Sequence, residues 1–83
     1  MLHLEVITNE SCGCCHDFID VLNEYTKAHT EVTFSESEIE KHKDRDIKGL
    51  PYTIVYKNNI EVGVILGNMR MDILDMQLKR FEK

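Results

Sequence analysis

Apolar and polar residues alternate at the start of the chain, where polar side chains separate Leu2, Leu4 and Val6. A period of two is typical of a strand that turns one face to a core, so the pattern predicts a strand over residues 2–7. The segment TEVTF at residues 30–34 is β-branched and aromatic, and it predicts a second strand. The chain between the two strands is long enough to hold a helix.

Apolar residues recur at helical spacing between these two strands. Phe18, Leu22 and Tyr25 follow one another at intervals of four and three, which is the spacing of one helix face. The polar stretch over residues 8–13 precedes this helix and is rich in turn-forming residues. The pattern therefore predicts a strand, a helix and a strand in succession.

The second half of the chain predicts a short helix and a hairpin. Residues 36–47 carry two strong apolar residues among many charges, so we expect a short helix that packs lightly against the rest. The segments at residues 52–57 and 60–66 are rich in β-branched residues and are separated by Asn58 and Asn59. Asparagine tolerates the positive φ that two-residue turns require, so the two segments are predicted to form an antiparallel hairpin.

A last helix is predicted after Gly67, with Asn68 as its N-cap and with basic residues near its C-terminal end, where they suit the helix dipole. The apolar residues that return at helical intervals are Ile73, Leu74, Leu78 and Phe81. The predicted order is β-α-β-α-β-β-α, which is an α/β fold. We expect a single domain over residues 1–83, because a chain this short cannot divide its apolar residues between two cores.

The composition narrows the possible partners. The sequence has 10 lysine and arginine residues against 15 aspartate and glutamate residues, and its net charge of −5 would repel a phosphate backbone. Nucleic acid is therefore not an expected partner. The apolar runs are far shorter than the ~20 residues that span a bilayer, and Glu5 and Glu10 interrupt the segment where a signal peptide has its apolar core. We therefore expect no membrane contact and a cytoplasmic location.

Three cysteines fall within four positions, at Cys12, Cys14 and Cys15, too close together to join distant segments. Cys12 and Cys15 form a C-x-x-C pair at the start of a predicted helix that follows a strand, a context in which the motif indicates redox chemistry. The free N–H groups of the first helical turn and the helix dipole favour a thiolate at Cys12, which we expect to be the nucleophile. Cys15 lies one turn further on and is placed to resolve the mixed disulfide that Cys12 forms with a substrate.

Other roles for this cluster stay open. Thiolates are soft metal ligands and His16 adds a nitrogen, but structural zinc sites usually draw two ligand pairs from separate segments, and the chain has no second cysteine pair. No metal or other cofactor is therefore expected. The cysteines are also not expected to be inert core residues, because three thiols so close together would pack poorly in a core. Cys14 is a spectator, a partner in an alternative disulfide or a site of glutathionylation. His16 is a polar residue of the first turn or a residue that tunes the thiols.

Gly49, Leu50 and Pro51 precede the predicted hairpin, and Pro51 is the only proline of the chain. A proline at the first residue of a strand loses no ladder hydrogen bond, and an ordinary trans turn is the plainer interpretation of this segment alone. The C-x-x-C pair upstream favours another interpretation. A cis Leu50–Pro51 bond would present the backbone of Leu50 to an extended peptide near Cys12.

On these motifs the sequence resembles the thioredoxin superfamily over roughly residues 2–82. The stretch DIKGLPY at residues 46–52 is similar to the thioredoxin segment Gly-Ile-Arg-Gly-Ile-Pro-Thr, which carries the cis-proline of the family. The KNN stretch at residues 57–59 is similar to the Lys-Asn-Gly hairpin turn of the family. Gly67 follows the proline at about the distance where thioredoxins have the glycine that borders their substrate groove.

The resemblance implies a thioredoxin-like fold, which is a four-stranded mixed sheet flanked by three helices. It also implies that Cys12 is the nucleophile, that Cys15 is the resolving thiol and that Pro51 is cis. The residues that it places at or near the substrate groove are Gly13, Gly49, Leu50, Pro51 and Gly67.

Several positions depart from the thioredoxin pattern. Ser11 stands where thioredoxins have a tryptophan, and Cys14 stands where they have a proline. Val6 occupies about the place of a buried aspartate that thioredoxins keep near the resolving cysteine, while Glu5 is expected to face the other way. The sequence has no counterpart of the first strand and helix of full-length thioredoxins, as in glutaredoxins, yet it has none of the glutaredoxin motifs.

The predicted function is reduction of protein disulfides by dithiol exchange through Cys12 and Cys15. The expected partners are protein disulfide substrates and an electron donor, which is either a flavoprotein of the thioredoxin-reductase type or glutathione. The chain is expected to act as a monomer. A glutathione-dependent, glutaredoxin-like reductase is the first alternative, and a module that binds a soft metal through its thiols is the second.

Overall fold

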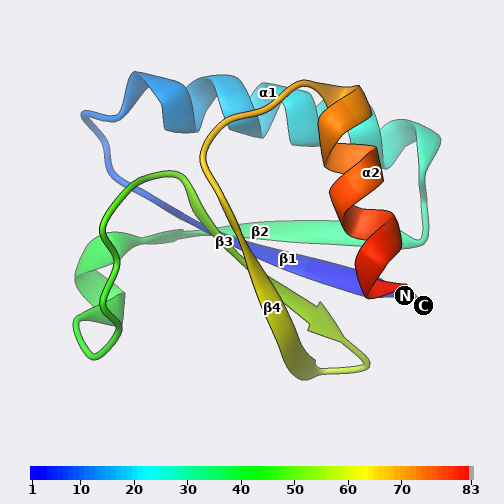
Figure 1. The fold of residues 1–83 in the computed structure, drawn as a ribbon. Helices are drawn as coiled ribbons and strands as arrows, with labels where there is room; N and C mark the ends of the chain where they lie inside the picture. The colour runs from blue at the N-terminus through cyan, green and yellow to red at the C-terminus, as the bar shows by residue number, and fades with distance from the viewer. Residues whose placement is uncertain (83) are drawn as a thin grey trace.

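The computed structural model describes residues 1–82, which form a sheet and two α-helices (Figure 1). The strands are β1 (Leu2–Thr8), β2 (Val32–Glu38), β3 (Tyr52–Lys57) and β4 (Ile60–Leu66). The helices are α1 (Gly13–Ala28), α2 (Met71–Phe81) and a 3₁₀ helix, η1 (Ile39–His42).

The sheet has four strands in the order β2-β1-β3-β4. β1 pairs in parallel with β2, while β1 with β3 and β3 with β4 are antiparallel pairs. The parallel pair requires a crossover, and α1 supplies it. The predicted α/β fold with a four-stranded mixed sheet is therefore confirmed.

Both α-helices pack on one face of the sheet (Figure 1). Side chains alternate between the two faces of a strand, so Leu2, Leu4 and Val6 all turn to the helices. They meet a buried stripe of α1 that has the predicted helical spacing. The remaining members of this core are Phe18, Leu22, Tyr25, Val32, Val55, Ile65, Leu74 and Leu78.

The predicted hairpin has the predicted bounds. Asn58 and Asn59 both have positive φ, at 54° and 69°, which is the backbone that a two-residue turn of this kind requires. Further along β4, Gly63 lies under the ring of Phe81, and a Cβ at this position would collide with that ring. This glycine therefore allows α2 to lie close against the strand.

The short helix predicted within residues 36–47 is a 3₁₀ helix of four residues and not an α-helix. β2 continues to Glu38 in register with β1, and only the four residues of η1 are helical within this segment. The segment has too few apolar side chains to bury a helix face, and its polar groups bond to the sheet instead: the His42 ring lies 2.9 Å from Ser37 Oγ and 3.6 Å from Glu5 Oε2. The predicted count of three helices is therefore corrected to two α-helices and one 3₁₀ helix.

The predicted N-cap of the last helix is also wrong. Asn68 precedes the helix by three positions, and Arg70 is the N-cap of α2 without a side-chain hydrogen bond. Met69 packs against the core, so the chain runs past Asn68 before it turns into the helix. No helix within residues 1–82 has the length and apolar character needed to cross a membrane.

The face of the sheet opposite the α-helices carries polar side chains beside the buried Ile7 and Ile54. Glu5 lies on this face, as expected, and accepts a hydrogen bond of 3.1 Å from the Tyr56 hydroxyl. His3 lies 2.8 Å from the Thr33 hydroxyl and 3.1 Å from the Ser35 hydroxyl. Glu5 and His3 therefore find their hydrogen-bond partners on the sheet itself.

Candidate redox site

Cys12 and Cys15 form a disulfide at the N-terminal end of α1, with their Cα atoms 5.3 Å apart. Cys12 is the N-cap of the helix, and its sulfur accepts a hydrogen bond of 3.2 Å from the backbone N–H of Cys15. This bond satisfies one of the N–H groups that the first turn leaves without an intrahelical partner. The pair therefore stands in the setting that favours a thiolate at Cys12.

The two sulfur-bearing residues differ in exposure. Cys12 is half-buried, whereas Cys15 is 1% exposed and belongs to the stripe of α1 that faces the sheet. A substrate that approaches from solvent therefore meets Cys12 before it meets Cys15.

The loop before the disulfide is held by Asn9. The side-chain oxygen of Asn9 accepts hydrogen bonds from the backbone N–H and the hydroxyl of Ser11, at 3.1 and 3.0 Å, and its carbonyl accepts from the N–H of Cys12 at 3.0 Å. This is an Asx turn, which organises a loop without regular structure. The sequence analysis missed this role of Asn9, although an asparagine two residues before a serine in a polar stretch is the usual signal for such a turn.

The other residues predicted at this end of α1 are exposed. Cys14 is a free thiol, and Gly13 has no atom within 4 Å of the place where a Cβ would stand. The His16 ring lies 3.4 Å from the carbonyl oxygen of Glu10, on the side of the loop. The structure therefore brings Cys12 and Cys15 together and leaves Cys14 and His16 on the surface.

The segment before β3 lies beside the end of β4. The Leu50–Pro51 peptide bond is cis, and Pro51 is buried. The N–H of Gly67 donates a hydrogen bond of 2.9 Å to the carbonyl oxygen of Pro51, and Gly67 has a φ of +84°, which glycine adopts without strain. Pro51 and Gly67, two predicted groove residues that are far apart in the sequence, are thus joined by a backbone hydrogen bond.

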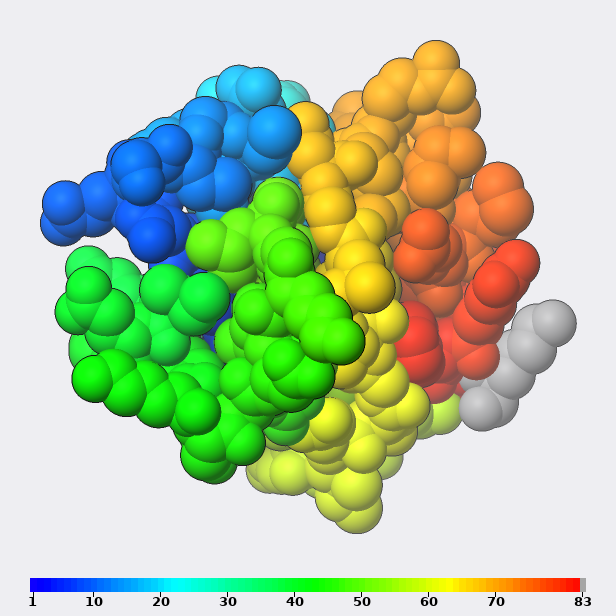
Figure 2. All heavy atoms as spheres, turned by 60° about the vertical axis from the view of Figure 1, so that its left-hand side comes forward, coloured from blue at the N-terminus to red at the C-terminus, as the bar shows by residue number. Residues whose placement is uncertain are grey.

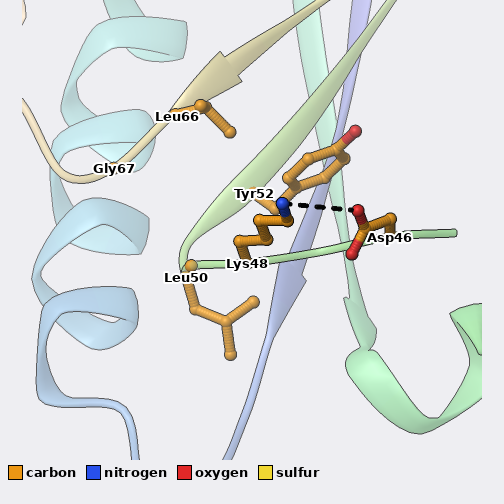
Figure 3. A pocket seen from close by; sticks show the side chains of 7 residues that line it. Asp46, Lys48, Leu50, Tyr52, Leu66 and Gly67 are labelled. Carbon is orange, nitrogen blue, oxygen red and sulfur yellow. Dashed lines mark ion pairs between the residues drawn. The ribbon is translucent and has the colours of Figure 1, made fainter.

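A hollow of about 480 Å³ lies against this segment (Figure 3). Leu50 and Gly67, which the resemblance places at the substrate groove, line this hollow, and an ion pair of 3.8 Å between Lys48 and Asp46 lies at its side. The lining residues that the sequence analysis did not assign to a groove are Asp46, Lys48, Tyr52 and Leu66. The sequence offered a signal for two of them, because Tyr52 directly follows the proline and Leu66 directly precedes the glycine.

Arg45 contacts Tyr52, which lines the hollow. Its guanidinium donates to the Glu61 carboxylate at 2.6 Å and to the Tyr52 hydroxyl at 3.2 Å, and it lies 5.8 Å from the centre of the Tyr52 ring. The hydrogen bond from Arg45 holds the pKa of Glu61 below its ordinary value. The loop before β3 is therefore attached to β4 by an ion pair that sequence spacing did not indicate.

The start of α1, the loop before β3 and the end of β4 gather on one side of the molecule. Figure 2 shows them there as the blue, green and gold regions. Within the described part of the chain, no group of three or more histidine, cysteine, aspartate or glutamate side chains is arranged to hold a metal ion.

No known protein-family profile matches the sequence, and no curated protein matches it. Solved structures do. The oxidised thioredoxin of Plasmodium falciparum superposes with a TM-score of 0.77 at 23% identity, over 96% of this chain and 80% of that one. The Fasciola hepatica thioredoxin gives 0.79 at 19% identity, over 95% and 79%. A malaria parasite thioredoxin-2, described as a component of protein secretion machinery, gives 0.81 at 14% identity, over 96% and 82%.

This chain has the thioredoxin-like fold. Within that fold, Val6 is fully buried on the helix-covered face of β1, where the resemblance places a buried aspartate in thioredoxins. The carboxylate of Glu5, next along the strand, is on the opposite face, bonded to Tyr56. Val6 is thus a buried apolar residue, while its neighbour Glu5 is on the polar side of the strand.

Proposed function

We propose that the chain is a thiol-disulfide oxidoreductase that reduces disulfides of other proteins by dithiol exchange through Cys12 and Cys15. The observation that supports this most is the disulfide between a half-exposed cysteine at the N-cap of α1 and a buried cysteine one turn later. The thioredoxin-like fold supports the same class of chemistry. The chain acts as a single domain and a monomer, in the cytoplasm, where thiols are kept reduced.

The exchange has two steps. The Cys12 thiolate attacks one sulfur of a substrate disulfide, so that a Cys12–substrate disulfide forms and the second substrate sulfur leaves as a thiolate. The Cys15 thiolate then attacks the Cys12 sulfur, the Cys12–Cys15 disulfide forms and the first substrate sulfur leaves. Two electrons pass to the substrate, and the two protons of the cysteine pair end on the two substrate thiols. An electron donor then returns two electrons and two protons to the Cys12–Cys15 pair. This donor is a flavoprotein of the thioredoxin-reductase type or glutathione.

The substrate lies along the segment before β3. An extended peptide beside Cys12 would meet the backbone of Leu50 and Pro51 and one of its side chains would enter the hollow next to Gly67. Gly13, exposed on the first turn of α1, leaves room for the backbone of that peptide. The apolar wall formed by Leu50 and Leu66 suits an apolar side chain, while Lys48 and Asp46 offer polar contacts at its side.

Reduction of a protein disulfide such as that of insulin tests this proposal. We expect turnover by the wild-type chain when a thioredoxin-reductase-type flavoprotein or glutathione supplies electrons, and comparison of the two donors identifies which one the protein uses. Cys12→Ser should abolish turnover, because it removes the nucleophile. Cys14→Ser is the matched control and should keep most of it, because Cys14 lies outside the disulfide. An inactive Cys14→Ser variant, or turnover by Cys12→Ser, would refute the assignment.

A further inference from the structure

The hydroxyl of Thr53 is fully buried and has no hydrogen-bond partner among residues 1–82. It is the only buried side-chain nitrogen or oxygen of these residues in that condition. An unsatisfied buried hydroxyl destabilises a protein, and a valine would have the same shape without that cost. The position of the hydroxyl indicates what it does.

Thr53 lies on the helix-covered face of β3. Its cross-strand partners are Val6 on β1 and Ile65 on β4, both of which belong to the core under the helices. Val55, two residues further along β3, belongs to the same core, and residues two apart in a strand share a face. The hydroxyl is therefore in the layer between the sheet and the helices.

This position is at the end of the sheet that the first turn of α1 covers (Figure 1). β1 ends at Thr8 and α1 begins at Gly13, so a short loop joins the end of β1 to the first turn of the helix. Because β3 is antiparallel to β1, its first residues lie at the same end. The residue of the first turn that points to the sheet is Cys15, the first member of the buried stripe of α1.

The two sulfurs of the disulfide differ in their donors. Cys12 Sγ accepts the backbone N–H of Cys15 at 3.2 Å. Among the hydrogen bonds of residues 1–82, none ends on Cys15 Sγ. The structure thus has, at one end of the sheet, a buried sulfur without a donor and a buried donor without an acceptor.

We propose that the Thr53 hydroxyl donates a hydrogen bond to the Cys15 sulfur when the disulfide is reduced and Cys15 is a thiolate, and that this bond stabilises the reduced pair in that ionised form. A disulfide sulfur is a weak acceptor, whereas a thiolate carries a full charge and forms charge-assisted hydrogen bonds. The bond therefore forms on reduction, and Thr53 is a positioning residue that serves the resolving thiolate. The inference rests on the proposed dithiol exchange, with a neutral hydroxyl acting beside Val6, where thioredoxins have the buried aspartate.

The equilibrium of the Cys12–Cys15 disulfide with reduced and oxidised glutathione measures this effect. At a pH at which Cys15 is ionised in the reduced protein, we expect Thr53→Val to lower the equilibrium constant for reduction about tenfold, which is a change of about 30 mV toward a more negative potential. We also expect the pH midpoint for alkylation of Cys15, measured with Cys12 and Cys14 replaced by serine, to rise by about one unit in the same variant. The oxidised form of Thr53→Val should be at least as stable as the wild type, because it no longer buries an unsatisfied hydroxyl.

Two controls separate a hydroxyl effect from a packing effect. Thr53→Ser keeps the hydroxyl and should keep the wild-type equilibrium, while Thr53→Ala should not, and this pair repeats the test at smaller side-chain size. Thr26→Val makes the same chemical change near the far end of α1, where the hydroxyl bonds to the Leu22 carbonyl oxygen, and should leave the equilibrium unchanged.

An unchanged glutathione equilibrium in Thr53→Val, or one that Thr53→Ser also shifts, would overturn the inference. So would a loss of stability of oxidised Thr53→Val with an unchanged equilibrium, which would mark the hydroxyl as structural. The measurement needs no protein substrate. A wild-type chain that fails to reduce protein disulfides but shows the tenfold shift would refute the proposed function alone.

Discussion

The two sulfurs of the Cys12–Cys15 pair face different surroundings. Cys12 is half-buried and its sulfur accepts a hydrogen bond from a backbone N–H, while the Cys15 side chain is buried on the side of α1 that faces the sheet. A thiol beneath the surface cannot start the reaction with a large substrate, but it can finish it, because the Cys12 sulfur is within one helical turn. The difference in burial is the reason for the order of the two steps in the proposed exchange.

This order predicts a trapped intermediate. In a Cys15→Ser variant that also carries Cys14→Ser, Cys12 should still attack a substrate disulfide and nothing should resolve the product. A covalent adduct with the substrate should therefore accumulate and should be released by added dithiol, as gel electrophoresis under non-reducing and reducing conditions would show. The same experiment with Cys12→Ser is the control and should yield no adduct. Adducts in that control, or none in the test variant, would count against the two-thiol mechanism.

Leu66 tests the role of the hollow. Its side chain is 66% exposed and lines the hollow next to Gly67, so it contributes little to the core. We expect Leu66→Ser to lower kcat/KM for a protein disulfide about fivefold, since partial burial of a leucine side chain on binding stabilises a complex by about 1 kcal/mol. The rate with a small disulfide and the thermal midpoint should hardly change. Equal losses for both substrates would instead indicate a general disturbance of the cysteine site.

At the scale of the elements, the segments with strong local signals were the ones predicted correctly. The hairpin followed from the adjacent asparagines at Asn58 and Asn59, whose positive φ values the structure shows, and α1 followed from its apolar stripe. The segment over residues 36–47 was predicted only in part, because its conformation depends on partners far away in the sequence. The contacts of His42 with Glu5 and of Arg45 with Glu61 cannot be inferred from periodicity.

The same reasoning applies to the candidate site. Cys12 and Cys15 could be predicted because a C-x-x-C pair at a helix N-terminus is a local motif, and the disulfide between them bears out the pairing. Thr53 could not be predicted, because a threonine in a β-rich run is an ordinary strand residue. Its unsatisfied hydroxyl is a property of the packed layer, which only the assembled sheet and helix reveal.

The contact between the two helices predicts a pH dependence. The Tyr25 hydroxyl of α1 donates a hydrogen bond of 2.8 Å to Asp75 of α2. Burial, reinforced by this bond, raises the pKa of Tyr25, while the hydrogen bonds from Lys79 and Tyr25 lower the pKa of Asp75. The protonated tyrosine therefore stabilises the fold fully below pH ~10 and less as the pH rises above it, where the unfolded chain ionises. The ionised aspartate stabilises the fold above pH ~4, and this stabilisation is lost as the pH falls through the lowered pKa.

Tyr25→Phe removes the hydroxyl that donates the hydrogen bond to Asp75. We expect the variant to lose about 1 kcal/mol at neutral pH, which lowers the thermal midpoint by about 4–8 °C in a chain of this size. The difference from the wild type should shrink above pH ~10 and also at acid pH, where Asp75 is protonated. Thermal unfolding followed across the pH range measures both limits. A difference that stays constant from acid to alkaline pH would show that the loss comes from packing and not from the hydroxyl–carboxylate bond.

The charge of the whole molecule bears on its choice of substrate. The chain carries a net charge of −5, and three glutamates, Glu10, Glu38 and Glu40, line a second hollow of about 170 Å³ beside the loop that leads to Cys12. A negative field at this place attracts positively charged proteins and repels negatively charged ones before any contact forms. The attraction acts over about one Debye length, which is ~10 Å at 0.1 M salt, and it weakens as salt is added.

Basic disulfide proteins should therefore be reduced faster than acidic ones of similar size. At ~0.02 M salt we expect the rate constant for a basic substrate to exceed that for an acidic one about tenfold, because steering of this kind changes association rates by 10-fold or more. The ratio should approach one near 0.5 M salt, and an uncharged small disulfide should show no salt dependence. Glu38→Gln combined with Glu40→Gln should reduce the ratio at low salt while leaving the rate with the small disulfide unchanged, since both carboxylates are exposed and outside the cysteine pair. If the ratio of the two rate constants did not change with salt concentration, the preference would come from contacts in the groove and not from the electrostatic field of the molecule.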